Sequence, residues 1–376
     1  MVQEDGRLVA LEALAGRATS RVPVTAFTWG FDYSWRVAGL EPWQLAFGGS
    51  DTWHRAHMAV LERHGTDVIL YNGAGSGTEE ATLLGEDARR WRVRDNNTGW
   101  VGYLTKDSLA VVDPETGHNL AYPVRDIHTR EEVDAMIPEH QSFGPVYLEG
   151  LSRLMREAGD RALVLPEAVP GYICACYTLG FERSMEALID GPEFLLYLAD
   201  RVALGDENRM RELAAAGAEG VFIADSWASC DIVSPAQYER YAWPYQARTV
   251  NAAKAAGLRA ILWNEGDLVP ILKQHADLAI DGVAFEQPRK GFAVTVAKVR
   301  EVFGPDRCVF GNLDSELMFM RNDPREIAEA VADQIRQSGP GASFILNTGS
   351  PLPSNVDPSA VDAMVSAART VFQPQA

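Results

Sequence analysis

GVFIA at residues 220–224 is a short apolar run followed by two polar residues, Asp225 and Ser226. Further apolar runs, each followed by at least one polar residue, lie at residues 258–263, 282–285, 308–311 and 343–347. Short apolar runs bounded by turn residues are typical of strands that are buried on both faces, as in a parallel sheet. The repeat therefore predicts a series of parallel strands in the C-terminal half.

Segments with helical spacing separate these runs. Each is bounded by residues that favour the start or the end of a helix, namely Pro192, Gly217, Ser234, Pro235, Gly257, Asp323 and Pro324. Earlier in the chain, residues 22–28, 67–71 and 162–166 are further strand candidates. Strands that alternate with helices indicate an α/β protein.

Residues 89–112 break this alternation. Three short apolar runs lie there, and Asn and Gly residues at 95–99 separate the first two, which predicts an antiparallel β meander with a turn. No low-complexity linker divides the chain. We therefore expect one domain over residues 1–376, a (β/α)8 TIM barrel with this meander inserted in its N-terminal half.

Composition narrows the class of protein. The 376 residues carry 34 basic and 52 acidic side chains, a net charge of −18, and no Lys/Arg cluster suited to nucleic acid is expected. The sequence shows no apolar stretch of about eighteen residues and no secretory signal, and the four cysteines form no evident disulfide framework. These features predict a cytoplasmic enzyme that binds neither nucleic acid nor membrane.

Polar and aromatic residues stand at the predicted strand ends. In a barrel the carboxyl ends of the strands form the working face, so these side chains should converge on one mouth and bind a small molecule. The candidates are Trp29, Asp32, Asn72, Asp225, Ser226, Trp227, Trp263, Asn264, Glu265, Glu286, Asn312, Asp314, Asn347 and Ser350.

Structural roles compete with this hypothesis at several positions. Asp225 and Asp314 are equally typical of helix caps, and Asn312 of a side chain that satisfies loop backbone groups. Trp263 suits packing inside the barrel better than contact with substrate. The prediction of a binding site at the barrel mouth therefore depends on the whole set of residues rather than on any one of them.

Four segments resemble the uroporphyrinogen decarboxylase superfamily, in order along the chain. They are GFERSM at 180–185 ahead of Pro192-Glu193, DSWASCDIVSPAQY at 225–238, VFGNLD at 309–314 and ILNTGS at 345–350. The resemblance covers about residues 165–370 well and the N-terminal half loosely. It implies decarboxylases of tetrapyrroles that need no cofactor, or methyltransferases that work with a corrinoid protein or a thiol carrier and often with zinc. It also implies a homodimer.

The sequence departs from both kinds of enzyme. The decarboxylases resembled here carry an arginine-rich RQAGR stretch near the N-terminus, whereas the corresponding residues 24–33 read VTAFTWGFDY, with no arginine from there until Arg36. A substrate with many carboxylates needs cationic partners. The His-x-Cys-Gly zinc motif of the methyltransferases is replaced by Trp263-Asn264-Glu265-Gly266, and Ser350 replaces the later cysteine.

Other soft ligands offer no substitute for that zinc site. Cys174 and Cys176, placed in a strand, should alternate between its faces and pack in the core. His54, His57 and His64 are expected to be surface histidines. We therefore predict no metal site.

The leading hypothesis is a metal-independent, methyltransferase-like enzyme that works with a corrinoid, on a partner corrinoid protein, or with tetrahydrofolate. Residues 29–40 resemble the opening of methyltransferase-like members. Glu265, Asn264 and Asp225 are the predicted catalytic residues, and no tightly bound cofactor is expected. The alternatives are a decarboxylase or lyase for a smaller acid, with Asp32 or Glu265 as proton donor, and a non-catalytic ligand-binding protein.

Overall fold

A curled parallel sheet forms the centre of the computed structural model, which describes residues 5–28, 32–113, 124–288 and 291–371. Seven strands follow one another in the order β1-β6-β7-β8-β9-β10-β11. Their bounds are Val68–Tyr71 (β1), Leu163–Ala168 (β6), Gly220–Asp225 (β7), Arg259–Asn264 (β8), Gly282–Phe285 (β9), Cys308–Phe310 (β10) and Phe344–Ile345 (β11). Each of the seven overlaps a strand predicted from the apolar runs.

The N-terminal segment joins the two edges of this sheet. Val24 bridges Leu346 beyond β11, and Thr25 bridges Val68 at the start of β1, both in parallel. The backbone N–H of Thr25 donates to the Leu346 carbonyl at 2.9 Å. A full strand was predicted over residues 22–28, but only these two residues of the segment make β-bridges. The curled sheet fits the predicted TIM barrel.

Side chains alternate between the inside of the ring and the layer of helices around it, as strand geometry requires. Phe222 and Ala224 of β7 and Ile261 and Trp263 of β8 pack in the inner cluster. The residues between them, such as Ile223 and Leu262, pack against the helices. The ring is thus filled with apolar side chains, and functional groups are left to the strand ends.

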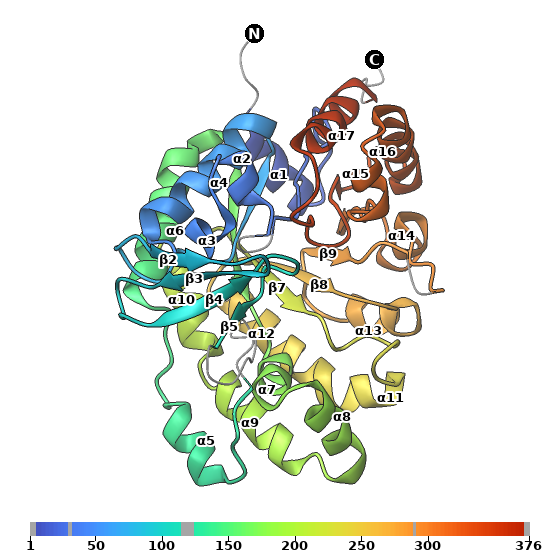
Figure 1. Cartoon of the computed structure of the whole chain (residues 1–376). Coiled ribbons are helices and arrows are strands. Elements are labelled where there is room, and N and C mark those ends of the chain that lie inside the picture. Colours follow the sequence, from blue (N-terminus) through green and yellow to red (C-terminus); the bar gives the residue numbers. More distant parts are fainter. Residues whose placement is uncertain (1–4, 29–31, 114–123, 289–290, 372–376) are drawn as a thin grey trace.

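Helices surround the sheet, as Figure 1 shows, and α1 and α17 lie at the same end of the molecule. Within the described residues no helix is both long and apolar enough to cross a membrane. The bounds of the helices are Gly6–Leu14 (α1), Ser34–Val37 (α2), Pro42–Ala46 (α3), Ser50–His64 (α4), Arg130–Met136 (α5), Pro145–Ala158 (α6), Gly171–Leu179 (α7), Phe181–Asp190 (α8), Glu193–Ala203 (α9), Asp206–Ala215 (α10), Pro235–Gln237 (α11), Trp243–Ala255 (α12), Leu272–Ala276 (α13), Val296–Phe303 (α14), Leu317–Arg321 (α15), Pro324–Ser338 (α16) and Pro358–Val371 (α17).

Predicted helix caps explain several of these boundaries. The Ser234 side chain accepts a hydrogen bond from the Gln237 N–H ahead of α11, and Asp323 accepts one from the Arg325 N–H ahead of α16. A π-helical turn at Tyr238–Ala242 connects α11 to α12. Gly257, which follows α12, has a φ of 81°, a conformation that glycine adopts without strain.

The insertion after β1 is an antiparallel meander of four strands, one more than predicted. They are Thr82–Glu86 (β2), Arg90–Arg94 (β3), Val101–Thr105 (β4) and Val111–Val112 (β5). The predicted turn is present: the Gly99 N–H donates to the Asp95 carbonyl at 2.8 Å. Figure 1 shows this sheet beside the barrel.

Basic residues do gather on the meander, contrary to the expectation from composition. Arg90, Arg92 and Arg94 are exposed at alternate positions of β3, so they share one face of this sheet. The guanidinium of Arg90 lies 3.9 Å from the centre of the Tyr103 ring. The negative net charge of the whole chain therefore gave no indication of this local cluster of arginines.

Two further predictions from local sequence are wrong. Cys174 and Cys176 lie in helix α7 rather than in a strand, although Cys176 is buried as expected. His54, His57 and His64 are buried on α4 rather than at the surface. His64, for example, contacts Asp362 at 2.6 Å through Nδ1 and the Tyr33 hydroxyl at 2.9 Å through Nε2, which ties α4 to α17.

Candidate active site at the barrel mouth

The strand-end residues fall into two sets that face opposite ways. Continuing the alternation of β1, β6, β7, β8, β9 and β11 places one set toward the barrel axis: Asn72, Glu167, Ser226, Glu265, Glu286 and Asn347. Asp225 and Asn264 occupy the intervening positions and contact the helices instead. The mouth is therefore lined by the first set.

Glu286 joins the loops that follow β8, β9 and β11. Its Oε2 accepts a hydrogen bond from the Gly266 N–H at 2.8 Å, and its Oε1 accepts one from the Ser350 hydroxyl at 3.3 Å. Trp263 reaches across the ring, and its indole N–H donates to the Gly349 carbonyl at 3.0 Å. Three loops that are distant in sequence thus meet at one place, next to Glu265.

Asp225 lies in a fully buried network between the sheet and α12. Its Oδ2 accepts a hydrogen bond from Gln246 Nε2 at 2.9 Å, and Gln246 Oε1 accepts one from the Tyr238 hydroxyl at 2.6 Å. Burial raises the pKa of the Asp225 carboxyl to about 7. Its Oδ1 has no hydrogen-bond partner among the described residues.

Asn264 stands beside Asp225 in the register of β7 and β8 and belongs to the same outer layer. Its Oδ1 lies 2.9 Å from Nε2 of His275 on α13, and the His275 ring stacks on that of Tyr238. Burial lowers the pKa of His275 to about 4, so the imidazole is neutral. Asn264 and Asp225 therefore connect the barrel to its helices rather than line the mouth.

Asn312, Asp314 and Trp263 have the structural roles that the sequence offered as alternatives to a functional role. The Asn312 amide donates to the backbone carbonyls of Glu286 and Val294, at 3.0 and 2.9 Å. Asp314 accepts from two backbone N–H groups ahead of α15. Trp263 is buried inside the ring, where it packs edge-to-face on Phe27 with ring centres 5.2 Å apart.

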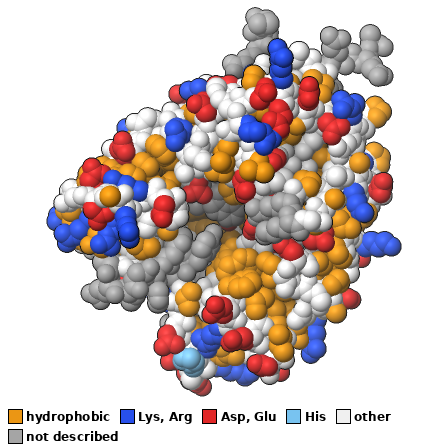
Figure 2. Space-filling view, turned by 45° about the vertical axis from the view of Figure 1, so that its right-hand side comes forward, with side chains coloured by type: hydrophobic (Ala, Val, Ile, Leu, Met, Phe, Trp, Pro, Cys, Tyr) orange, Lys and Arg blue, Asp and Glu red, His pale blue; other side chains and the backbone are white. Residues whose placement is uncertain are grey.

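Aromatic side chains stand beside the mouth after β7. The Trp227 ring packs edge-to-face against Tyr177 of α7, at 4.8 Å between ring centres, and against Phe181 of α8, at 5.2 Å. The Tyr177 hydroxyl bonds to the Ser226 hydroxyl. Figure 2 shows hydrophobic side chains gathered next to a hollow on one face of the molecule. The predicted candidate Trp29 lies outside the described residues.

Asp32 is the remaining predicted carboxylate. It precedes α2 and is partly buried, and burial raises the pKa of its carboxyl to about 6. It therefore changes charge near neutral pH.

Sequence reasoning missed two polar residues at the strand ends: Glu167, which faces the mouth, and Gln287. Glu167 lies inside β6, whereas the predicted strand ended at Pro166; extending the alternation of Leu163 and Leu165 by one step would have found it. Gln287 follows Glu286 and is buried.

Unpartnered polar atoms concentrate at the strand ends. Among the described residues, buried side-chain atoms without a hydrogen-bond partner include Asn72 Oδ1, Gln287 Oε1 and both amide atoms of Asn347. Asn347 is only 1% exposed. A buried amide that makes no hydrogen bond destabilises a protein by about 1–3 kcal/mol, so such groups indicate a place where a ligand or water completes the bonding.

The described part of the chain contains no cluster of side chains that could bind a metal ion. No three histidine, cysteine, aspartate or glutamate side chains there are close enough to hold an ion. Two positions of the zinc motif have other contacts. The Trp263 indole donates a hydrogen bond to the Gly349 carbonyl inside the barrel, and the Ser350 hydroxyl donates one to Glu286.

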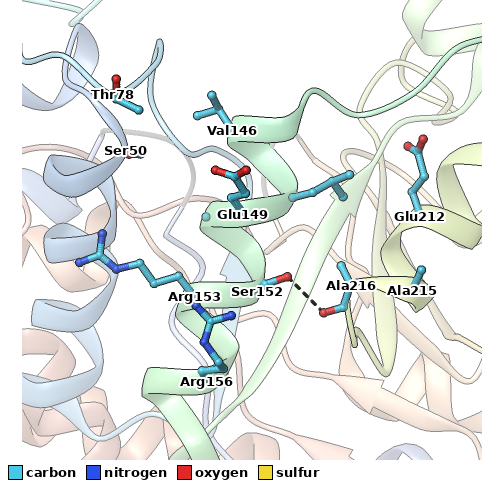
Figure 3. A pocket seen from close by; sticks show the side chains of 12 residues that line it. Ser50, Thr78, Val146, Glu149, Ser152, Arg153, Arg156, Glu212, Ala215 and Ala216 are labelled. Carbon is cyan, nitrogen blue, oxygen red and sulfur yellow. Dashed lines mark hydrogen bonds between the residues drawn. The ribbon is translucent and has the colours of Figure 1, made fainter.

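A separate cavity of about 640 Å³ lies on the outside of the barrel, among α4, α6 and α10. Figure 3 shows Arg153 and Glu149 on α6 at its wall and Glu212 beyond them. Arg153 pairs with Asp51 and Glu157, and Glu212 accepts a hydrogen bond from the Phe143 N–H at 2.8 Å. Arg153 and Glu212 thus already have partners within the protein, whereas buried amides without partners lie at the strand ends, so we place the site at the mouth.

Comparison with known proteins supports the resemblance in the sequence. A model of the family described as uroporphyrinogen decarboxylase (URO-D) matches residues 110–371. The uroporphyrinogen decarboxylase of Citrifermentans bemidjiense is 27% identical over 277 residues, which cover 70% of this chain and 77% of that protein. That of Anaeromyxobacter dehalogenans is 28% identical over 258 residues, covering 67% and 70%.

Among solved structures, a methyltransferase from Methanosarcina mazei has a similar fold. It aligns with a TM-score of 0.69 at 19% sequence identity and covers 97% of this chain and 98% of its own. The family match extends over more than half of the sequence and includes all the motifs on which the resemblance rested. The chain belongs to the uroporphyrinogen decarboxylase (URO-D) family.

Proposed function

We propose that this protein is a methyltransferase-like enzyme that moves a methyl group between a corrinoid and a small molecule such as tetrahydrofolate or a methoxylated compound. The observation that carries the proposal is the convergence of Glu265, Glu286 and Ser350 at the mouth, beside unpartnered amides. The fold shared with the Methanosarcina mazei methyltransferase supports it.

The charge of the mouth argues against a substrate with many carboxylates. The inward-facing strand-end residues include Glu265 and Glu286, and none of the six is a lysine or an arginine. Like charges in a partly dehydrated site repel one another, and a polycarboxylate would also need guanidinium partners. A neutral or cationic ligand matches this electrostatic environment better.

Amide side chains suit a corrinoid or a pterin. Both carry polar edges with donors and acceptors side by side, and the Asn347 amide has a donor and an acceptor atom to offer. When bound, the corrinoid supplies the centre that gives or receives the methyl group. Asn72 and Asn347 would hold its polar edge or that of the second substrate.

The protein's own contribution is mainly orientation. Methyl transfer requires an in-line approach of donor and acceptor, and holding both in position lowers the entropic part of the barrier. Glu265 faces the same mouth and orients a heteroatom of the small molecule. Trp227 offers a flat apolar surface for a ring.

The direct test combines the purified protein with methylcobalamin and a set of acceptors that includes a thiol, tetrahydrofolate and a phenol. Loss of the methyl group changes the visible spectrum of the corrinoid, which follows the reaction without separation. Enzyme-dependent demethylation with at least one acceptor is expected. No exchange with any acceptor, nor in the reverse direction from methoxylated compounds, would refute the proposal.

Asp32 favours a second candidate, a decarboxylase or lyase for a small acid. A carboxyl with a pKa of about 6 is partly protonated near neutral pH and is able to donate a proton to a carbanion. The test is release of carbon dioxide from a panel of small carboxylates. Release that is retained in Asp32→Asn would exclude Asp32 as the donor.

A further inference from the structure

Glu167 lies within β6 and faces the mouth, one step beyond Leu165 of the inner cluster. The register of β1 and β6 pairs Tyr71 with Pro166, so the next positions along are Asn72 and Glu167. Leu70 and Leu165, two positions earlier in each strand, face inward, so Asn72 and Glu167 face inward as well. The two are therefore neighbours on the same side of the mouth.

Both side chains leave polar atoms to a ligand. The Oδ1 of Asn72 is buried without a partner, and the Glu167 carboxyl makes no hydrogen bond or ion pair with any described residue. Burial raises the pKa of Glu167 to about 8. The carboxyl is therefore mostly protonated at neutral pH, and it is then a donor as well as an acceptor.

The titratable groups around Glu167 do not favour its ionised form. The titratable neighbours on the packed elements are Tyr71 of β1, Tyr147 of α6 and Cys174 of α7. Burial raises the pKa of all three, to about 12 for the Cys174 thiol and well above the ordinary value for the two tyrosine hydroxyls, so all three are neutral near pH 8. Glu265 and Glu286 face the same mouth, and a negative charge on either would oppose ionisation of Glu167 rather than favour it.

We propose that Glu167 is the proton donor of this site and protonates the heteroatom from which the methyl group departs, with Asn72 positioned beside the same leaving group. This inference rests on the proposed methyl transfer, taken in the direction of demethylation of the small molecule. It assigns the substrate class: a neutral compound with a methylated oxygen, nitrogen or sulfur. A leaving group of this kind needs a proton when its conjugate base is strong.

The step balances in atoms and electrons. The bond between the methyl carbon and the heteroatom breaks, and its electron pair stays on the heteroatom, which takes the proton of Glu167. The methyl carbon forms its new bond with an electron pair from the reduced corrinoid, which formally gives up that pair. Glu167 is left as a carboxylate and regains a proton from water.

Two measurements on the full-length protein test this role. Infrared spectroscopy with ¹³C-labelled glutamate detects the carbonyl stretch of a protonated carboxyl group near neutral pH. That band should disappear in Glu167→Gln and persist in Glu149→Gln, a matched change at an exposed position of α6. The band in the wild type should itself titrate near pH 8.

The second measurement is the pH profile of demethylation of a methoxylated aromatic compound by the reduced corrinoid. Wild-type turnover should fall above about pH 8, where Glu167 ionises. In Glu167→Gln kcat should drop about 100-fold, KM should change little because glutamine retains the shape and the hydrogen-bond donor, and the alkaline limb should vanish. Glu149→Gln should match the wild type in all three respects.

The outcomes separate this inference from the proposed function. A protonated-carboxyl band that survives in Glu167→Gln, or an alkaline limb that survives there, overturns the role of Glu167 while methyl transfer stands. A wild type that transfers no methyl group rejects the proposed function, and the donor role with it, whatever the infrared spectrum shows. Loss of both band and limb in Glu167→Gln alone supports the inference.

Discussion

Asn264 and Glu265 are neighbours in the chain, yet they belong to different regions of the molecule. Asn264 is the last residue of β8 and is fully buried against His275 in the outer layer, whereas Glu265 is partly exposed at the mouth beside Gly266 and Glu286. Asp225 and Ser226 at the end of β7 divide in the same way. One residue of each pair holds the barrel to its helices, and the other faces the hollow.

The contrast teaches that position at a strand end does not by itself assign a catalytic role. Alternation decides which residue of a pair reaches the mouth. The predicted catalytic set combined both regions, since it placed Asn264 and Asp225 together with Glu265. The outer residues instead form a hydrogen-bonded network whose loss should change stability, and the inner residues should change rate.

The largest expected effect is on Glu265. Glu265→Gln keeps the size of the side chain but removes its carboxyl group. Turnover in the methylcobalamin assay should fall by about 100-fold, the effect expected when a substrate is no longer held in line for reaction. The thermal midpoint should stay close to that of the wild type.

A control for Glu265→Gln is Glu149→Gln, which makes the same chemical change on the outside of the barrel. It should alter neither rate nor stability. Equal rates for Glu265→Gln and the wild type would show that the mouth does not depend on this carboxylate.

Asn264→Ala should show the opposite pattern. The change removes the partner of His275 Nε2 in a fully buried layer and leaves a small void. The free energy of unfolding should drop by about 2 kcal/mol, measured by urea denaturation at a pH where His275 is neutral. Turnover per folded molecule should remain within about threefold of the wild type. A large loss of rate at full stability would return Asn264 to the catalytic set.

Asp225 makes the outer region sensitive to pH. Its pKa is about 7 in the folded protein, against an ordinary value of 3.8. Between those two values the folded state binds more protons than the unfolded state, so the contribution of Asp225 to stability is largest below about pH 4, falls as the pH rises toward 7 and levels off above it. The neutral Asp225→Asn lacks this dependence and keeps an oxygen for Gln246.

The measurement for Asp225 is the difference in unfolding free energy between pH 5 and pH 8, by urea denaturation in both proteins. The wild type should lose at least ~1 kcal/mol more than Asp225→Asn over this interval. Glu167 and Asp32 titrate in both proteins, so the comparison isolates Asp225. Parallel curves for the two proteins would show that Asp225 is already ionised at pH 5.

Most of the fold followed from the periodicity of the sequence. Apolar runs of four to six residues marked β1 and β6 to β11 because a strand buried on both faces has no polar positions. The N-terminal strand was overestimated, since residues 22–28 are apolar but only Val24 and Thr25 make bridges. Strand β2 was missed because most of its side chains are exposed and carry little pattern.

The site was predicted less completely, for physical reasons. The polar strand ends were found by position, but which way each side chain faces depends on strand bounds that differ by one residue, as at Glu167. The burial of His54, His57 and His64 arises from partners far along the chain, such as Glu157 and Asp362. Contacts of that kind leave no local signal in one sequence.

The smallest expected effect belongs to Ser350, an inner residue that acts only through another. Its hydroxyl donates to Glu286 Oε1 at 3.3 Å, a long hydrogen bond, while Glu286 Oε2 is held separately by the Gly266 N–H at 2.8 Å. Ser350→Ala should therefore lower stability by about 0.5–1 kcal/mol and turnover only a few fold. Because Glu286 keeps its shorter bond, substrate affinity should change less than kcat, as expected for a residue that only orients a carboxylate. Ser350→Thr, which keeps the hydroxyl, should recover most of the rate if its added methyl group fits; a loss as large as that of Glu265→Gln would instead place the Ser350 hydroxyl in direct contact with the reacting atoms.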